Sequence, residues 1–334
     1  MSLSHRERIE RAISGEEVDR LPWSMWKHCH NIDRFPRKLA EYTLMMQREL
    51  DLDFVKFIPY GQVQCVDWGL DLRQSQSDLE QPRIVEPVIK TLSDWDKIVP
   101  RRGYEGEYAV ILEAQRIVKE SLPKDVPFIV TIFSPLTIAT WLSDNSTVLT
   151  HMRLYPEKVE HAFEIIMETM IDYVEAAVRG GADGYFLAVR NSQVDLLSRE
   201  EHKRFVMKYD MEMINRLKSK TWLNVAHIHG AHTWREDIVK NYDVPIFNWH
   251  DRDDGPSFDE ARKLSPDKCF WGGLSHLKSL IDGTDEEIKV QVADTLRHNN
   301  GKRVILGPGC VVNSRTSMER LKFVAECVKA TAKD

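Results

Sequence analysis

Short apolar runs alternate with longer amphipathic segments along nearly the whole chain. The short runs are rich in β-branched and aromatic residues and are bounded by glycine or polar positions, which is typical of buried strands. Eight runs fit this description, at residues 20–26, 54–58, 127–133, 184–189, 222–229, 244–249, 269–274 and 303–307. The segments between them repeat apolar residues at helical spacing, as in 37–50, 157–179, 199–218, 234–240, 258–264 and 285–298.

This alternation predicts a parallel sheet whose strands are joined by right-handed helical crossovers. Eight such units in 334 residues predict an α/β fold, a single (β/α)8 TIM barrel spanning residues 1–334. A doubly wound sheet is the alternative, but no glycine-rich phosphate loop follows the first strand. A helix over residues 4–14 is expected to close the bottom of the barrel.

A long insertion of about residues 59–126 is expected after the second strand. Residues 67–70 and 84–89 resemble the two sides of a small hairpin, and a helix is expected from about residue 106 to 121. Insertions of this length in a compact fold are usually functional or form interaction surfaces.

Composition and charge argue against nucleic-acid-binding, membrane-spanning and disulfide-rich classes of protein. The formal charge of −6 gives no electrostatic case for nucleic acid binding. No apolar run approaches the roughly 20 residues that a membrane span needs, and the first residues lack a signal-peptide core. The five cysteines are scattered and odd in number, which favours free thiols in a reducing compartment. We therefore expect a cytoplasmic protein, a monomer or homodimer, that acts on a small molecule.

Chemistry-bearing residues gather where the predicted strands end, the edge at which barrels of this kind place their active sites. Many could instead have plain structural roles: Arg190 could hold a loop carboxylate rather than an anionic substrate group, and the aromatic residues could simply pack. The expected substrate-binding residues are Trp26, His28, Arg190, Asn191, Asn248 and Trp249, and the expected catalytic residues are Lys56, Tyr60 and His229.

Two histidines at the end of the fifth predicted strand suggest a metal site. His227 and His229 are two residues apart, so their side chains point to the same face of a strand. Cys310 follows Gly-Pro-Gly after the eighth strand, which lies across the barrel from the fifth. Two imidazoles and a thiolate can hold zinc with its fourth position open. Alternatively, one histidine is a core residue and the other caps a loop, because His-x-His with a remote cysteine often arises by chance.

At this point the chain resembles the uroporphyrinogen decarboxylase superfamily, which includes corrinoid-linked, zinc-dependent methyltransferases. The resemblance covers nearly the whole sequence and implies an eight-stranded (β/α) barrel with its cleft at the strand ends. It is carried by residues 6–22, 53–56, 180–184, 227–230, 248–249, 271–274 and 306–310.

The resemblance also separates two branches. Porphyrinogen decarboxylases are expected to have an Arg-Gln-Ala-Gly-Arg loop after the first strand and an Asp after the second, but this chain has Trp-Lys-His-Cys-His-Asn at 26–31 and Ile-Pro-Tyr at 58–60. The methyltransferases are expected to bind zinc through His-x-Cys after the fifth strand and Cys after the eighth. His227 and Cys310 match, and His229 stands where the middle Cys is expected. Imidazole also ligates zinc, so a site survives this change.

The leading hypothesis is a zinc-dependent methyltransferase that moves a methyl group between a corrinoid, carried by a partner corrinoid protein, and a small acceptor. Trp26, Tyr60 and Trp249 would wall its pocket, with Asn248 and Arg190 orienting polar groups. The alternative is a decarboxylase or lyase acting on a porphyrinogen or a smaller aromatic acid, with His229 or Lys56 as proton donor. A third hypothesis is a non-catalytic module that binds a corrinoid or tetrapyrrole.

Overall fold

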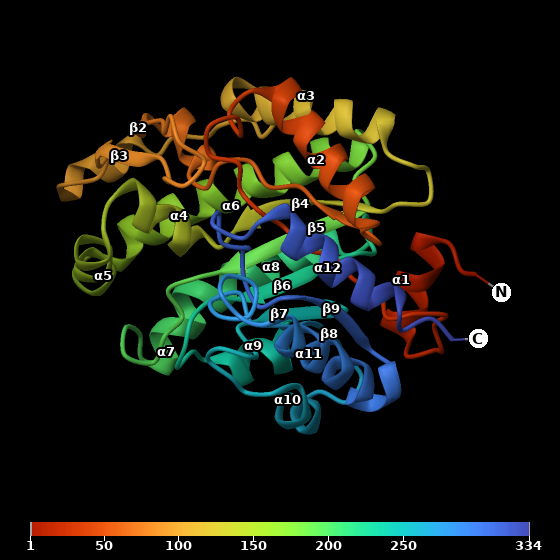
Figure 1. Ribbon diagram of the computed structural model, residues 1–334. Coiled ribbons are helices and arrows are strands. Elements are labelled where there is room, and N and C mark those ends of the chain that lie inside the picture. Colours follow the sequence, from red (N-terminus) through yellow and green to blue (C-terminus); the bar gives the residue numbers. More distant parts are fainter. Residues whose placement is uncertain (1, 334) are drawn as a thin grey trace.

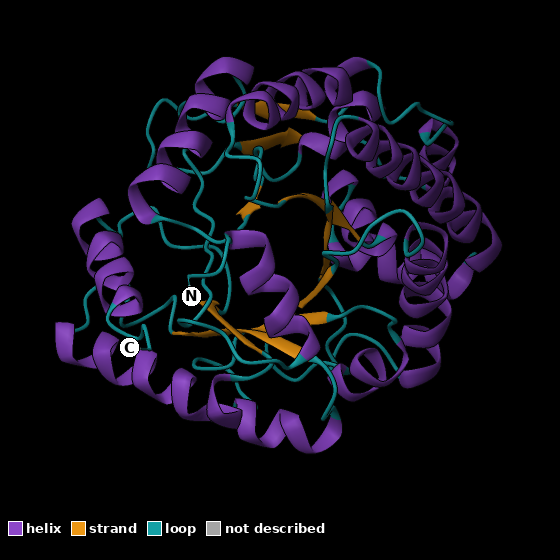
Figure 2. Ribbon diagram, turned by 90° about the vertical axis from the view of Figure 1, so that its right-hand side faces the viewer, coloured by secondary structure: helices purple, strands orange, loops and turns teal. Residues whose placement is uncertain are grey.

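A curved sheet of seven parallel strands forms the centre of the molecule. The computed structural model describes residues 2–333, and Figures 1 and 2 show helices packed around this sheet. Every hydrogen-bonded neighbour pair in the sheet is parallel. The strands follow in chain order: β1 (Val55–Lys56), β4 (Phe128–Phe133), β5 (Gly184–Val189), β6 (Val225–Ile228), β7 (Ile246–Trp249), β8 (Cys269–Leu274) and β9 (Val304–Pro308).

The first predicted strand, at residues 20–26, is present only as isolated bridges. Trp23 bridges Leu306 of β9, and Lys27 bridges Val312, both in parallel orientation. On the other side of this segment, the Asp53 N–H donates to the Trp23 carbonyl oxygen at 2.9 Å. The segment therefore lies between the two edge strands of the sheet. Pro22 has no N–H to donate, which limits regular pairing there.

The helices form an outer layer around the sheet (Figure 2). Two helices begin where the sequence predicts, at residues 199 and 285, because Ser198 and Thr284 precede them and form capping boxes; α6 ends at Arg179, also as predicted. A π-helical turn, Lys203–Met207, joins α7 to α8. The helices of this layer include α2 (Pro36–Leu50), α4 (Pro135–Leu142), α5 (Asn145–Leu154), α6 (Pro156–Arg179), α7 (Arg199–His202), α8 (Lys208–Leu217), α9 (Arg235–Asn241), α10 (Phe258–Leu264), α11 (Asp285–Arg297) and α12 (Met318–Lys329).

Helix α1 (His5–Ser14) covers one end of the ring of strands, where Figure 2 shows it crossing in front. Its residues Ile9 and Ala12 are buried in a cluster with inward-facing strand side chains such as Ile129 and Val225. The helix thus seals the end of the sheet opposite the strands' carboxyl ends, and those carboxyl ends stay free for a site.

The stretch between β1 and β4 holds several small elements. They are η1 (Val63–Trp68), an antiparallel hairpin of β2 (Asp71–Arg73) and β3 (Arg83–Glu86), η2 (Leu92–Lys97) and α3 (Gly106–Ser121). The expected hairpin is therefore present, but its first strand begins after 67–70, where η1 ends at Gly69 in the left-handed conformation. No helix within residues 2–333 is long and apolar enough to cross a membrane.

Candidate metal centre and cavity

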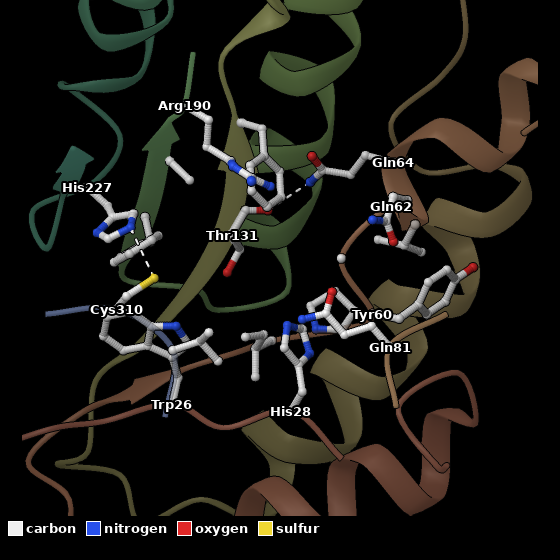
Figure 3. A pocket seen from close by; sticks show the side chains of 18 of the residues that line it. Trp26, His28, Tyr60, Gln62, Gln64, Gln81, Thr131, Arg190, His227 and Cys310 are labelled. Carbon is white, nitrogen blue, oxygen red and sulfur yellow. Dashed lines mark hydrogen bonds between the residues drawn. The ribbon is translucent and has the colours of Figure 1, made fainter. Parts of the chain in front are cut away.

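A cavity of about 220 Å³ opens at the carboxyl ends of the strands (Figure 3). It is the place where a parallel barrel-like sheet is expected to bind small molecules. Its wall includes side chains from six separate strand ends or following loops, among them Trp26, Lys56, Arg190, His227, His229 and Cys310.

His227 and Cys310 face each other at this cavity (Figure 3). The His227 Nε2 lies 3.7 Å from the Cys310 Sγ. Gly309 permits the approach, because a Cβ there would lie 2.8 Å from the His250 Cα and 2.9 Å from the Trp249 carbonyl oxygen. The small residue before Cys310 therefore brings the thiol against the end of β7, where His250 follows.

His250 completes a group of three metal-ligating side chains. One ligand atom from each of His227, His250 and Cys310 lies within 4.8 Å of the others. The His250 Nδ1 is 2.7 Å from an Asp254 carboxylate oxygen, whereas its Nε2 is buried without a hydrogen-bond partner. A buried imidazole nitrogen left unpaired while the other nitrogen is held by a carboxylate is typical of a metal ligand.

The tautomer of the neutral His227 imidazole is fixed by Asn248 on the neighbouring strand. The Asn248 Nδ2 donates to the carbonyl oxygens of Trp271 and Pro308 at 2.6 and 3.1 Å. Its Oδ1 must then face the His227 Nδ1, with which it forms a short hydrogen bond. Because an amide oxygen only accepts, the proton lies on Nδ1, and the Nε2 lone pair points toward Cys310.

His229 lies beside this group rather than within it. Its ring centroid is 5.8 Å from that of His227 and 5.0 Å from that of His250, and its side chain lines the cavity. The set that the structure brings together therefore differs from the sequence-based set of His227, His229 and Cys310 by one residue. His229 directly follows β6, and its N–H donates to the Val189 carbonyl oxygen at 3.0 Å, which continues the pairing with β5.

Burial dominates the electrostatics of the site. It lowers the pKa of His227, of His250 and of His229, the last to about 3, so all three imidazoles are neutral at neutral pH. Burial also raises the pKa of the Cys310 thiol to about 11. Neutral imidazoles suit a metal, and a bound cation would favour the thiolate form of Cys310.

Two cationic side chains share the cavity. The Lys56 Nζ lies 4.8 and 4.2 Å from the ring centroids of Trp26 and Phe186, and burial lowers the pKa of Lys56 to about 7. Arg190 stacks near Trp141, and burial lowers its pKa, although a guanidinium remains charged. Within residues 2–333, neither side chain has a carboxylate oxygen within 4.0 Å. The cavity therefore holds positive charge that is not neutralised by an ion pair.

The other predicted residues fall into two groups. Trp26, His28 and Tyr60 line the cavity, but the Tyr60 hydroxyl donates to Glu107 at 2.7 Å, and burial raises its pKa. The remaining three, Asn191, Asn248 and Trp249, do not line it.

Strand alternation explains the placement of Trp249. Asn248 points inward to His227, so its neighbour Trp249 points outward and packs against Phe258 and Phe270, with ring centroids 5.4 and 5.1 Å apart. The expectation that Trp249 walls the pocket is corrected accordingly. Asn191 has a positive φ of 58° and donates to Asn145, which directs its side chain away from the cavity.

His250 is the residue that sequence reasoning missed. It directly follows the sixth predicted strand, so its position at the carboxyl edge was visible, and Asp254 four residues later is an acceptor for its Nδ1. The number of residues that separate His250 from His227, or from Cys310, does not match a recognisable metal-binding motif. Its role emerges only when β6 and β7 pair in register, His227 opposite Asn248.

The chain is similar to a known protein family over nearly its whole length. The family model described as uroporphyrinogen decarboxylase (URO-D) matches residues 4–331. The chain belongs to the URO-D family.

Curated relatives of this URO-D family member carry two kinds of name. The methylcobamide:CoM methyltransferase MtbA of Methanosarcina acetivorans is 23% identical, covering 97% of each chain, and MtaA of Methanosarcina barkeri is 29% identical, covering 95% of each. A uroporphyrinogen decarboxylase of Trichlorobacter lovleyi is 24% identical, covering 95% of this chain and 96% of the relative. The URO-D family is an enzyme family, and the relatives include both methyltransferases and decarboxylases.

Solved structures agree on the fold. A methyltransferase from Methanosarcina mazei superposes with a TM-score of 0.81 at 19% identity and covers 98% of this chain and 99% of its own. At this level of sequence identity, the structural match supports the α/β architecture of this URO-D family member. Its chemistry must be argued from the residues of its own site.

Proposed function

We propose that this protein is a zinc-dependent methyltransferase that moves a methyl group between a corrinoid and a small anionic acceptor, with a thiol as the favoured acceptor. The observation that carries the proposal is the grouping of His227, His250 and Cys310 at the strand ends. Two relatives with methyltransferase names cover nearly the whole chain. We also infer that the segment bridged at Trp23 and Lys27 takes the place of the eighth strand and closes the barrel.

The donor set fits zinc. Ligand lengths of about 2.3 Å to sulfur and about 2.05 Å to nitrogen at a tetrahedral angle separate the two ligand atoms by about 3.6 Å. The observed separation between the His227 Nε2 and the Cys310 Sγ is 3.7 Å. The unpaired Nε2 of His250 supplies a third donor. Three protein ligands with one position left open are the pattern of catalytic zinc sites.

When bound, zinc would supply Lewis acidity, which lowers the pKa of an acceptor thiol. A bound corrinoid would supply the methyl group to the deprotonated sulfur of the acceptor, and its cobalt would keep both electrons of the broken cobalt–carbon bond. Lys56, whose pKa of about 7 lets it take or release a proton near neutral pH, is the residue that we assign to hold the acceptor's proton.

The cavity supports a small, negatively charged acceptor. Its volume of about 220 Å³ lies below the 300–1,000 Å³ that is common for pockets holding drug-sized ligands. Arg190 is partly buried and has no ion-pair partner among the described residues, so an anionic group on the acceptor would neutralise it and form charge-assisted hydrogen bonds. Trp26 and Phe186 cover Lys56 and exclude water from that end of the cavity.

A second cavity supports approach by a larger group. It has a volume of about 470 Å³, shares His229 and Cys310 with the first, and is also lined by His250 and His276. The apolar side chains of Leu79 and Leu277 at this cavity are 63% and 55% exposed. We assign this side to the corrinoid and, where the corrinoid is protein-bound, to its carrier protein.

Methylcobalamin provides the direct test. Purified protein loaded with zinc is mixed with methylcobalamin and a panel of thiols that includes coenzyme M, and the loss of the methylcobalamin spectrum is followed anaerobically. Demethylation that requires zinc, and that Cys310→Ser abolishes, supports the proposal. Absence of demethylation with every thiol overturns methyl transfer to thiols. Release of carbon dioxide from an aromatic or porphyrinogen acid in the presence of chelator would instead identify a decarboxylase.

A further inference from the structure

A second group of metal-ligating side chains lies in the loop after residue 27. It consists of His28, His30 and Asp33, whose ligand atoms also lie within 4.8 Å of one another. The Asp33 N–H donates to the Cys29 carbonyl oxygen at 2.9 Å, which closes a turn and brings the carboxylate back over the two imidazoles. The rings of His28 and His30 stack with centroids 4.8 Å apart.

The polar atoms of this group are buried and unpaired. The Asp33 side chain is fully buried and that of His30 is 6% exposed. Neither carboxylate oxygen of Asp33, nor the Nδ1 of His28 or of His30, has a hydrogen-bond partner. Among residues 2–333, no lysine or arginine nitrogen lies within 4.0 Å of Asp33. A buried carboxylate with neither a hydrogen bond nor a cation carries a large desolvation penalty, which requires compensation.

The distances within the group match those between ligands of one ion. The Asp33 Oδ2 lies 3.6 Å from the His28 Nδ1 and 3.5 Å from the His30 Nδ1. Hydrogen bonds between such atoms are shorter, at about 2.7–3.2 Å. Tetrahedral ligands at about 2.05 Å for nitrogen and about 2.1 Å for oxygen are separated by about 3.4 Å. A cation at the centre of the three atoms would satisfy all of them at once.

We propose that His28, His30 and Asp33 form a second metal site, which takes a divalent transition-metal ion of the zinc type. Two imidazoles and one carboxylate are suitable donors for such an ion. Both histidines line the two cavities that Cys310 also lines. Figure 3 shows His28 projecting into the first cavity, between Trp26 and Tyr60 in that view. The second ion would therefore lie in the wall of the same cavity, where its remaining positions are accessible to an anionic oxygen of a bound molecule.

This proposal stands independently of methyl transfer, and metal stoichiometry tests it. Full-length protein is stripped with chelator, reloaded with zinc, desalted and measured for zinc per chain. We expect two ions in the wild type, one in Asp33→Asn, one in Cys310→Ser and none in the double variant. One ion in both the wild type and Asp33→Asn would overturn the second site, whereas two ions in both the wild type and Cys310→Ser would overturn the first.

Thermal unfolding separates loss of metal from loss of fold. In chelator, Asp33→Asn should unfold at or above the wild-type temperature, because it removes an uncompensated buried charge. Added zinc should raise the unfolding temperature of Cys310→Ser but leave that of the Asp33→Asn, Cys310→Ser double variant unchanged. If Asp33 instead forms an ion pair with a protonated histidine, Asp33→Asn will unfold at a lower temperature in chelator, which contradicts the proposal.

Discussion

The Asn248 side chain orients the His227 imidazole. Its Nδ2 donates to two carbonyl oxygens, which leaves only its Oδ1 for the His227 Nδ1 and directs the Nε2 lone pair toward Cys310. The residues sit opposite each other on adjacent strands β6 and β7. The parallel sheet therefore sets both the position and the tautomer of a metal-binding imidazole. Partners of this kind raise the affinity of the ligand they hold.

Asn248→Ala should weaken zinc binding at the His227 centre by about 10- to 100-fold, the range found when a partner of a ligating histidine is removed. Competition with a chromophoric chelator measures the change. Asn241→Ala is a matched control, because this amide lies at the end of α9 and donates to the Asp237 carbonyl oxygen. Equal affinities for the wild type and Asn248→Ala would show that the hydrogen bond does not support the ligand.

Arg190→Gln should raise the KM for an anionic thiol by about 10- to 100-fold, corresponding to a charged hydrogen bond of roughly 1.5–3 kcal/mol. A neutral thiol of similar length should show little change, because it offers no partner for the guanidinium. Steady-state kinetics with such a pair of acceptors makes the comparison. A similar loss with both acceptors would indicate that Arg190 supports the cavity wall rather than the anion.

Asp210 should make stability depend on pH. This buried carboxyl group on α8 accepts from the hydroxyls of Ser134 and Tyr242, and burial raises its pKa to about 7. The unfolded chain has the ordinary value of about 3.9, so the folded state binds the extra proton between these values. Unfolding then releases a proton, and the free energy of unfolding contributed by this group falls as pH rises from about 4 to about 7.

Asp210→Asn should remove this part of the pH dependence, because the amide oxygen can still accept from both hydroxyls. Relative to the wild type, the variant should gain about 4 kcal/mol between pH 4 and pH 8. Urea unfolding at several pH values measures the difference. Parallel pH profiles for the two proteins would mean that the carboxyl group titrates normally in the folded state.

Sequence periodicity predicted most of the strands because buried parallel strands are short, apolar and separated by long amphipathic helices. Seven of the eight expected strands are present, within a few residues of their predicted ends. The segment around Trp23 has the same apolar character, but it forms only isolated bridges. Apolar content reports burial, whereas regular pairing also depends on backbone donors that Pro22 lacks.

The site was harder to predict than the fold. His227 and Cys310 could be found because each stands at the end of an apolar run. Which other side chain reaches them depends on the register between strands and on the close approach of Gly309 to His250, and the sequence contains no record of either. The same register turns Trp249 outward, since adjacent strand residues face opposite sides. The grouping of His28 and His30 with Asp33 was not predicted, because Asp33 comes over the two imidazoles only through the turn at Cys29.

The central claim is that His250, rather than His229, joins His227 and Cys310 in holding the metal. Cobalt(II) substitution tests it most directly, because thiolate-to-cobalt charge-transfer absorption reports the ion bound by Cys310 alone. The account predicts that His229→Ala retains this absorption and that His250→Ala loses it or needs far more cobalt to reach it, with Cys310→Ser as the baseline. Retention in His250→Ala together with loss in His229→Ala would contradict the account.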